Sequence, residues 1–449
     1  MFKNILRVTI SNIINFGATF LVGFILPLVL SVEGYGYFRE YSLYLSFVFL
    51  FNFGFNDGIY IKYGGKELEN IDKLKVRQEH SFILLFQIFV FLVLLILSTF
   101  LQNSVLFMFS FVVYFLSVVN YHNNFFQAIG NFKVFSDSNI WRSLFYIIFL
   151  LLGIFVFKTK NYQVYIWINV LSYLAHLVFY EYYFRKSVGK NTLRFDKEIL
   201  QLFKLGIFIL IANMSMTFVG NIGAWVVNYG FDIKTFAQYS FQSSILNIII
   251  LVANAVGMVF YNVLAKSRED YEKIRLLKIA SMILAMILSI GIFFLKPIIS
   301  IFFVDYRESI QILTMTFLAL PYIIVSKILI SNLYKTLRSE RKYFIDALFF
   351  AILSFIFTAV IFLIFKNIYF IALSTTICYL IWYLYSVLIE FKELKPDLKE
   401  IVLITSHFVV FGLLNLINNW VGLIFYMFYL LIIIFMYKDD IFKFIKLSK

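Results

Sequence analysis

The sequence is poor in the side chains that build catalytic and metal centres. Its 449 residues include one cysteine and four histidines. Because Cys378, which lies within a long apolar stretch, is the one cysteine, the chain cannot form a disulfide with itself. The histidines are scattered, without a Cys/His cluster at metal-ligand spacing and without a His-Glu-x-x-His motif; they are His80, His122, His176 and His407. A phosphate-binding loop of the Gly-x-x-x-x-Gly-Lys-Ser/Thr type is also missing, which excludes a built-in ATPase. We therefore predict no metal site, no cofactor and no catalytic residue.

Charge is scarce as well. Only 14% of the chain is charged, whereas 62% is hydrophobic and the mean hydropathy is +0.88. That composition leaves too little polar surface for a soluble globular fold. Stretches of roughly 20 apolar residues cross a bilayer, and they do so as helices because lipid offers the backbone no hydrogen-bond partner. Fourteen such stretches lie at 10–30, 40–61, 81–101, 104–124, 140–157, 164–184, 204–230, 235–261, 278–295, 309–331, 343–365, 368–389, 401–418 and 420–437. We predict an all-α polytopic membrane protein with about 14 transmembrane helices.

The net charge of +14 is distributed by side of the membrane. If the N-terminus is cytoplasmic, 30 of the 39 Lys and Arg fall in cytoplasmic segments and 7 fall on the opposite side. Arg142 and Lys327 fall within the predicted spans. This asymmetry obeys the positive-inside rule. We therefore predict a multi-pass protein of the bacterial cytoplasmic (inner) membrane with both termini cytoplasmic, and we do not expect nucleic acid as a partner.

The connecting loops are short. The longest, near 62–80 and 185–203, have roughly 20 residues each and are predicted to be cytoplasmic. The first span lacks a cleavage site before Glu33, so it is predicted to stay as a helix and not to be removed as a signal peptide. No predicted outer segment is long enough to fold as a catalytic domain. This disfavours, without excluding, a membrane enzyme of polysaccharide assembly.

The chain repeats itself at an offset of 198 residues. Asn15 then aligns with Asn213, and Phe-x-x-Tyr-Ser recurs at 38–42 and 236–240. Six predicted spans separate the copies, so both halves enter the membrane in the same sense, as in transporters built from parallel repeats. Chance identity in a chain rich in Phe, Tyr and Ser is the alternative. We predict an N-terminal lobe at 1–190, a C-terminal lobe at 191–392 and two additional spans at 393–449.

Five short motifs resemble those of one known family. The segment from Pro27 to Phe38 resembles the first loop of bacterial polysaccharide (O-antigen) flippases, and the segment from Phe53 to Gly65 resembles the end of their second span. Their second half is matched by Lys204-Leu205-Gly206 and by Phe236-Ala237-Gln238-Tyr239-Ser240. Tyr261-Asn262-Val263-Leu264-Ala265 is similar to the family's Phe-Pro-x-Leu-Ala, with Asn262 in place of Pro. The resemblance covers most of residues 5–340.

The family belongs to the superfamily of multidrug, oligosaccharidyl-lipid and polysaccharide (MOP) exporters. The resemblance implies two pseudo-symmetric six-helix lobes around a central cavity, with the two extra helices at about 401–437 outside them. It implies that the protein is not an enzyme and flips a polyprenyl-pyrophosphate-linked oligosaccharide to the outer leaflet by alternating access. Membrane lipids, a polysaccharide polymerase and other assembly proteins are the implied partners. Coupling to Na⁺, H⁺ or the membrane potential stays open, as does the alternative of a cation-coupled multidrug exporter with the same fold.

An anionic headgroup calls for positive charge where it leaves water. A charge within the membrane is costly and usually faces the protein interior or a water-filled cavity. Lys327 and Arg142 are therefore candidates for the substrate cavity. The alternatives are a Lys327 amine that reaches the interface and an Arg142 that anchors the interface together with Trp141.

The remaining candidates are polar residues at span ends and on the repeated helices. Arg39 belongs to the candidate cavity set and Glu40 to the gate set, with a solvated pair as the alternative. Asp57 and Lys62 are gate or ion-coupling candidates, with Asp57 as a helix-end residue that is either solvated or paired with Lys62 as the alternative. Asn15 and Asn213 are expected to hydrogen-bond either sugar hydroxyls or neighbouring helices. Interfacial positions are expected for Glu181 and Asp346 and for the His122-Asn123-Asn124 cluster.

Overall fold

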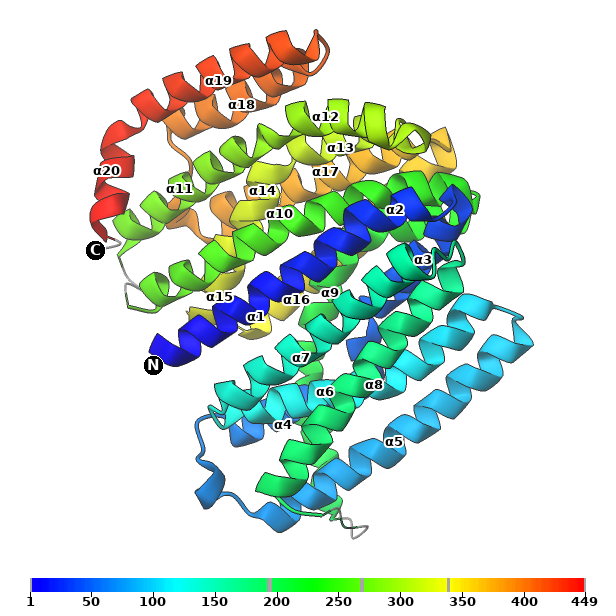
Figure 1. Cartoon of the computed structure of the whole chain (residues 1–449). Coiled ribbons are helices and arrows are strands. Elements are labelled where there is room, and N and C mark those ends of the chain that lie inside the picture. Colours follow the sequence, from blue (N-terminus) through cyan, green and yellow to red (C-terminus); the bar gives the residue numbers. More distant parts are fainter. Residues whose placement is uncertain (1, 191, 193–195, 267–269, 337–339, 448–449) are drawn as a thin grey trace. The chain divides into compact units, whose positions relative to one another are not determined.

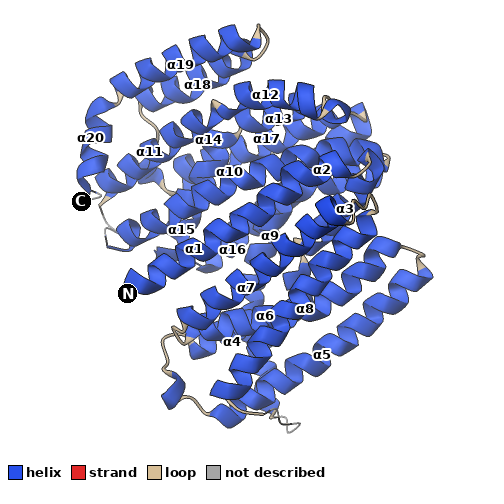
Figure 2. Ribbon diagram, in the orientation of Figure 1, coloured by secondary structure: helices blue, strands red, loops and turns tan. Residues whose placement is uncertain are grey.

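The computed structural model describes the chain except for residues 1, 191, 193–195, 267–269, 337–339 and 448–449. The chain is 88% helical, and the part that the structure describes contains no strand (Figure 2). It divides into two compact units, Met1–Thr217 and Phe218–Lys449, with the boundary inside one long helix, α9. The all-α fold predicted from the apolar stretches is confirmed.

The first unit consists of long helices joined by tight loops (Figure 1). Its helices are α1 (Phe2–Phe20), α2 (Leu26–Val29), α3 (Val32–Leu45), α4 (Phe55–Tyr63), α5 (Lys73–Phe100), α6 (Ser104–Ala128), α7 (Phe132–Leu151), α8 (Tyr162–Ser187) and the first part of α9 (Gln201–Gly230). Polar residues in the loops start several of them: the side chains of Asp72, Asn103, Asn131 and Asn161 accept hydrogen bonds from the first backbone N–H groups of α5, α6, α7 and α8. These caps fix where each long helix begins.

The second unit contains more broken helices. After the end of α9 come α10 (Ile233–Lys266), α11 (Tyr271–Ser289), α12 (Gly291–Phe302), α13 (Ser309–Leu318), α14 (Leu320–Val325), α15 (Ser331–Thr336), α16 (Glu340–Phe365), α17 (Ile368–Tyr385), α18 (Leu398–Leu414), α19 (Asn419–Met436) and α20 (Lys438–Leu447). The chain bends by 55° between α13 and α14, where Pro321 cannot donate a backbone hydrogen bond. A π-helical turn at Ser326–Ile330 separates α14 from α15.

Ten described helical segments are long and apolar enough to cross a membrane, or eleven if the bent α13–α15 segment counts as one span. The other predicted spans, at 40–61, 235–261 and 401–418, correspond to a broken helix, to the 34-residue α10 and to the 17-residue α18. The count of 14 is therefore consistent with the structure and is not established by it.

The predicted continuous span at 40–61 is wrong in one respect, because the chain breaks between α3 and α4. Phe53 and Gly54 have φ values of 53° and 87°, in the left-handed region that ends a right-handed helix. Gly54 adopts this conformation at little cost, whereas Phe53 does so against its preference. The hydropathy of the segment does not reveal the break, because apolar residues continue through it.

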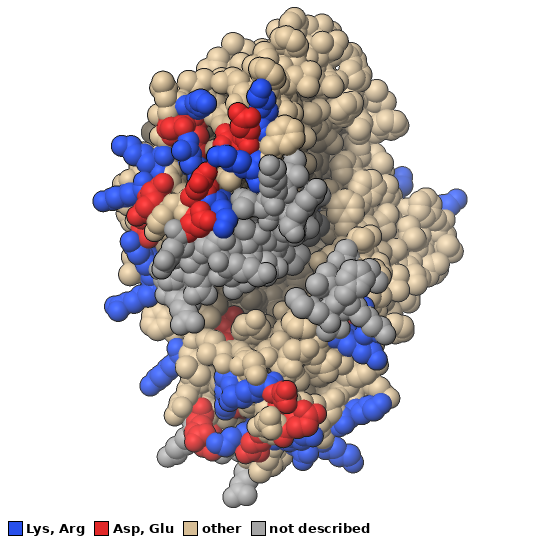
Figure 3. Space-filling view, turned by 90° about the vertical axis from the view of Figure 1, so that its left-hand side faces the viewer, with Lys and Arg blue, Asp and Glu red and all other residues tan. Residues whose placement is uncertain are grey.

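Large apolar side chains cover much of the outer surface. On α19 alone, Ile424, Phe428, Leu431 and Phe435 are each more than 60% exposed. A soluble protein rarely exposes so large an apolar face, whereas lipid favours one. Figure 3 shows one face on which the Lys, Arg, Asp and Glu side chains gather in clusters, next to wide areas that hold none of them. The chain is a multi-pass membrane protein.

Candidate functional site

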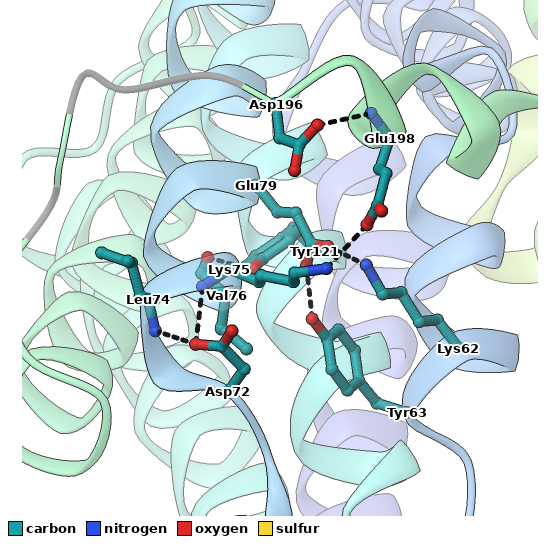
Figure 4. A network of polar contacts seen from close by, with 10 residues as sticks. All are labelled: Lys62, Tyr63, Asp72, Leu74, Lys75, Val76, Glu79, Tyr121, Asp196 and Glu198. Carbon is teal, nitrogen blue, oxygen red and sulfur yellow. Dashed lines mark hydrogen bonds and ion pairs between the residues drawn. The ribbon is translucent and has the colours of Figure 1, made fainter.

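A buried carboxylate lies at the start of α5, where the sequence places the first long loop. Glu79 is 1% exposed and accepts hydrogen bonds from Lys62 Nζ at 2.5 Å and from Tyr63 OH at 2.8 Å (Figure 4). Lys62 therefore pairs with Glu79, and the Lys62–Asp57 pair considered as an alternative is not formed. Sequence analysis overlooked Glu79. The sequence feature that could have indicated Glu79 is the polar run Gln78-Glu79-His80-Ser81. Four consecutive helical residues point in different directions, so at least one of these side chains must face a neighbouring helix.

The same end of the first unit carries a second ion pair, at the surface. Lys75 Nζ lies 2.7 Å from Glu198, just before α9, and Arg77 Nε donates to the backbone oxygen of Val188 at 2.7 Å (Figure 4 shows the Lys75–Glu198 pair). These contacts attach the segment between α8 and α9 to the start of α5. Both partners of the Lys75–Glu198 pair are about half exposed, so the pair adds little stability.

Asp57 lies where two backbones cross. A Cβ atom added to Gly206 would lie 1.9 Å from the Gly54 oxygen, 2.6 Å from the Gly58 nitrogen and 2.9 Å from Asp57 Cβ. Two of the family-like motifs, 53–65 and 204–206, therefore meet directly, and glycine is what lets them do so. Asp57 is half-buried beside this crossing, and no other described residue forms an ion pair or hydrogen bond with its carboxylate.

Arg142 lies among aromatic rings inside the first unit. The centre of its guanidinium lies 4.2 Å from the centroid of the Tyr173 ring and 5.8 Å from that of Tyr146. Its Nε atom is buried and has no hydrogen-bond partner in the described part of the chain. Close to these rings in space, Tyr41 OH donates to Asn169 at 2.8 Å. A guanidinium that is stacked on aromatic rings and has no carboxylate partner is able to bind an anionic ligand.

Lys327 lies in the π-helical turn that follows α14. The side chain is half-buried between buried Ser326 and Ile328, and the described residues offer its amine neither a carboxylate nor a hydrogen bond. Single π-turns inside helices are frequent at functional sites. A role of Lys327 in the substrate cavity stays a prediction.

A different basic residue of the second unit is fully neutralised. Lys278 Nζ donates to Glu400 at 2.9 Å and to the backbone oxygen of Leu394 at 2.6 Å, and both charged side chains are 0% exposed. The pair joins α11 to the start of α18. Nearby, burial raises the pKa of Asp397, but hydrogen bonds from the Glu400 backbone and from Arg275 outweigh it and leave that pKa lowered. Lys278 is the first residue of the predicted span at 278–295 and was counted with the cytoplasmic charges, so the pair was not predicted.

The other predicted site residues do not gather into one cluster. Glu40 is 9% exposed and accepts a hydrogen bond from Tyr44 at 2.5 Å, while the described structure shows no ion pair between it and Arg39. Asn15 is half-buried on α1, and Asn213 is exposed on α9. The solvated Arg39–Glu40 pair considered above is therefore not formed, whereas a role of these four residues in transport stays a prediction.

Two acidic residues expected at the interface are held by neighbouring side chains, and their interfacial position stays a prediction. Asp346 is 7% exposed and accepts hydrogen bonds from Tyr334 at 2.6 Å and from Tyr385 at 3.0 Å. Glu181 lies within 3.3 Å of His122 and within 2.8 Å of His80. The fold thus brings together histidines that are scattered in the sequence, and no sequence spacing signals this because the three residues belong to three helices.

The sequence matches a family model described as "Polysaccharide biosynthesis protein" over residues 1–266, more than half of the chain. The chain belongs to this family. The resemblance seen in the motifs is thereby confirmed. None of the curated proteins matches the sequence.

Solved structures similar to this polysaccharide biosynthesis protein are membrane transporters. One is the lipid II flippase MurJ in an inward closed conformation, at 17% identity, covering 98% of this chain and 100% of that one, with a TM-score of 0.71. An inward-facing multidrug resistance MATE transporter of the MOP superfamily aligns at 14% identity over 88% of this chain and 99% of its own, with a TM-score of 0.60. A MOP superfamily transporter from Pyrococcus furiosus aligns at 15% identity over 88% and 97%, with a TM-score of 0.54. At these identities the likeness shows a shared fold.

Proposed function

We propose that this protein flips a polyprenyl-pyrophosphate-linked oligosaccharide from the cytoplasmic to the outer leaflet of a bacterial cytoplasmic membrane. The product would serve the assembly of a surface polysaccharide such as O-antigen, capsule or exopolysaccharide. Membership of the polysaccharide biosynthesis family supports this proposal, as does a fold shared with a protein described as a lipid II flippase. The proposal includes cytoplasmic termini, in keeping with the charge bias of the loops.

The observation that carries the proposal is a difference between basic side chains within the membrane-spanning helices. Lys278 is neutralised by Glu400, as a permanently buried charge must be. Arg142 and Lys327 have no carboxylate partner among the described residues, although a charge in this environment is costly. An anionic ligand that binds and then leaves would neutralise such a side chain during transport. A fixed protein carboxylate would already occupy the side chain and prevent that binding. A pyrophosphate headgroup supplies the required charge.

The surroundings of Arg142 also suit the sugar part of the substrate. Tyr146 and Tyr173 present ring faces beside the guanidinium, and Tyr41 and Asn169 add a hydroxyl and an amide. Aromatic faces with nearby hydrogen-bonding groups are a common lining of sites for small polar ligands. Arg142 is therefore proposed to hold phosphate oxygens while the tyrosines contact the first sugar.

A cation-coupled multidrug exporter is the second candidate, because one carboxylate has no partner. The buried Glu79, Asp346 and Glu400 are each occupied by Lys or Tyr side chains, so they are poorly placed to take up Na⁺ or H⁺. Asp57 is half-buried and free among the described residues. We keep Asp57 as the ion-coupling or gate candidate in either version of the function, with Lys62 acting on it only if the Lys62–Glu79 pair opens.

Reconstitution tests the proposal directly. The protein is placed in liposomes that contain a polyprenyl-pyrophosphate oligosaccharide with a fluorophore on the sugar, and a membrane-impermeant quencher is added outside. We expect the protein to increase the fraction of fluorophore that is quenched with time, and an added lipophilic cation not to compete. Unchanged quenching in the presence of folded protein would contradict the flippase proposal, and export of the cation instead would favour the second candidate.

Arg142 variants then test the site. Arg142→Ala should lower the flipping rate at least about tenfold, because a charge-assisted contact contributes roughly 1.5–3 kcal/mol. Arg142→Lys should retain part of the rate, since it keeps the charge and loses the planar stacking group. Lys443→Ala is the matched control, because it removes the same charge from an exposed position on α20. Equal rates in Arg142→Ala and in the control would remove Arg142 from the proposed site.

A further inference from the structure

Three helices bring two imidazoles and one carboxylate together at one end of the first unit. His80 is on α5, His122 on α6 and Glu181 on α8. The Nε2 atoms of His80 and His122 lie 2.8 Å and 3.3 Å from Oε1 of Glu181, and the three ligand atoms all lie within 4.8 Å of one another. In a tetrahedral zinc shell with bonds of about 2.0–2.1 Å, neighbouring ligand atoms are roughly 3.3 Å apart. The two nitrogen–oxygen separations, 2.8 Å and 3.3 Å, are therefore close to that spacing, and all three atoms are near enough for one ion to reach with a small shift of the side chains.

The surroundings hold these groups in place and bury both imidazoles, while the Glu181 side chain stays 17% exposed. Both histidines are 0% exposed. The Phe184 ring lies 4.4 Å from the His80 ring, and the Tyr180 ring stacks on His122 at 5.3 Å, measured between ring centroids. Arg185 Nε lies 3.4 Å from the second oxygen of Glu181, Oε2. Such outer contacts orient a ligating carboxylate and leave its other oxygen for the ion.

The chemistry of the set selects the metal. Neutral imidazole nitrogen together with one carboxylate oxygen suits Zn²⁺, whereas Mg²⁺ and Ca²⁺ prefer shells made of oxygen. We propose that His80, His122 and Glu181 form a zinc site, with the fourth coordination position open to water. The ion would link α5, α6 and α8, which no covalent bond joins at this end of the unit.

One contact that strengthens many zinc sites is missing here. The Nδ1 atom of His122 has no hydrogen-bond partner in the described part of the chain. Ligating imidazoles usually donate their second N–H to an acceptor, and the loss of such a contact lowers metal affinity by about 10–100-fold. We therefore expect weaker binding than in a closed four-ligand structural site. His176 does not belong to the set; it is 1% exposed and stacks on Tyr180 at 4.9 Å.

Metal binding to the purified full-length protein tests this site without any transport assay. The protein is prepared with an affinity tag that contains no histidine, stripped with EDTA and mixed with Zn²⁺. We expect about one bound zinc per chain and a higher melting temperature, because an ion that binds only the folded state stabilises it. X-ray absorption should show two imidazole nitrogens and a carboxylate oxygen around the metal.

Single substitutions locate the ion. His80→Gln, His122→Gln and Glu181→Gln should each weaken zinc binding by about tenfold or more and abolish the rise in melting temperature. His176→Gln, a matched change of a buried histidine on α8, should leave both intact. Absence of zinc from the stripped and reloaded wild-type protein would overturn the proposal, as would a metal shell without imidazole. Equal loss of zinc in His176→Gln would also overturn it, because the effect would then come from general destabilisation.

Discussion

Three buried carboxylates each accept a hydrogen bond or ion pair from a neighbouring side chain. The donor differs from one carboxylate to the next. Glu79 meets Lys62 and Tyr63, Asp346 meets Tyr334 and Tyr385, and Glu400 meets Lys278. Burying an unpaired charge costs several kcal/mol, so each of these contacts is a condition for placing the residue there at all. At the scale of single residues, Arg142 and Lys327, which have no carboxylate partner among the described residues, therefore need an explanation.

The buried Lys278–Glu400 pair leads to a prediction about stability. Lys278→Ala leaves the Glu400 carboxylate buried and unpaired, so we expect it to lower the free energy of unfolding by about 3–5 kcal/mol. Lys278→Met combined with Glu400→Leu removes both charges and should restore most of that loss. Thermal unfolding in detergent measures both effects. Lys443→Ala breaks an exposed pair with Glu272 and should change little; a loss as large as that of Lys278→Ala would contradict the interpretation.

Lys327 leads to a prediction about transport. Lys327→Ala should impair surface-polysaccharide export without loss of protein from the membrane, and Lys327→Arg should retain part of it, because an anionic headgroup needs positive charge where it is desolvated. If the amine only reaches the interface, an uncharged polar residue is tolerated there as well. Export by Lys327→Gln, compared at equal protein level, separates the two interpretations. Full activity of this variant would exclude Lys327 from the substrate site.

At the scale of elements, the breaks in the helices are as informative as the helices. The chain leaves α3 and starts α4 through two residues in the left-handed region, Phe53 and Gly54. This break brings the backbone of α4 against that of α9, at Gly54, Gly58 and Gly206. A Cβ atom on Gly58 would lie 2.2 Å from the Leu202 oxygen. The crossing depends on the absence of side chains on both helices.

The crossing predicts that a single methyl group is destabilising. Gly206→Ala places a Cβ 1.9 Å from the Gly54 oxygen, so the helices must separate. We expect a loss of about 1–3 kcal/mol or more, as in other overpacked sites. Gly412→Ala is the matched control, because Gly412 is also inside a helix and has no atom within 4 Å of an added Cβ. That change should be neutral or stabilise by about 0.5–1 kcal/mol. Thermal unfolding of both variants measures the two changes in stability. If Gly206→Ala were as stable as Gly412→Ala, the two backbones would be farther apart at the crossing than described.

At the scale of the whole molecule, the bias of the basic residues predicts how the chain is inserted. The 30-to-7 distribution of Lys and Arg predicts that both termini lie in the cytoplasm. Because both termini are then on one side, the chain must cross the membrane an even number of times. By length and composition the described helices supply ten spans, or eleven with the bent α13–α15 segment, and only those eleven together with α10, α18 and the broken α3–α4 segment would give the predicted fourteen. The assignment of lobes at 1–190, 191–392 and 393–449 stays a prediction.

Topology reporters test the insertion. Fusions after Lys160 and Lys366 should report the outside, and a fusion after Lys449 should report the cytoplasm, because the charge bias fixes the side of each loop. Labelling of single introduced cysteines gives an independent measurement, since the one natural cysteine, Cys378, is buried. An outside signal at Lys449 would mean that the number of spans is odd.

The sequence by itself determined the class of this protein. Apolar stretches near 20 residues, the polar caps between them and the charge bias are local or additive properties, so the all-α polytopic fold and the family-like motifs can be read without coordinates. The local break at Gly54 escaped this reading, because hydropathy averages over a window and is insensitive to the backbone angle of one residue.

Only the tertiary structure decided which polar residues meet. Glu79 and Lys62 are 17 residues apart, Lys278 and Glu400 are 122 apart, and His122 and Glu181 are 59 apart. Each pair depends on how neighbouring helices rotate and how far they slide along one another. Those two variables are set by the packing of many apolar side chains together, which no single spacing in the sequence records. Which charges are neutralised, such as that of Lys278, and which stay without a carboxylate partner, such as that of Arg142, is therefore decided only when the helices pack.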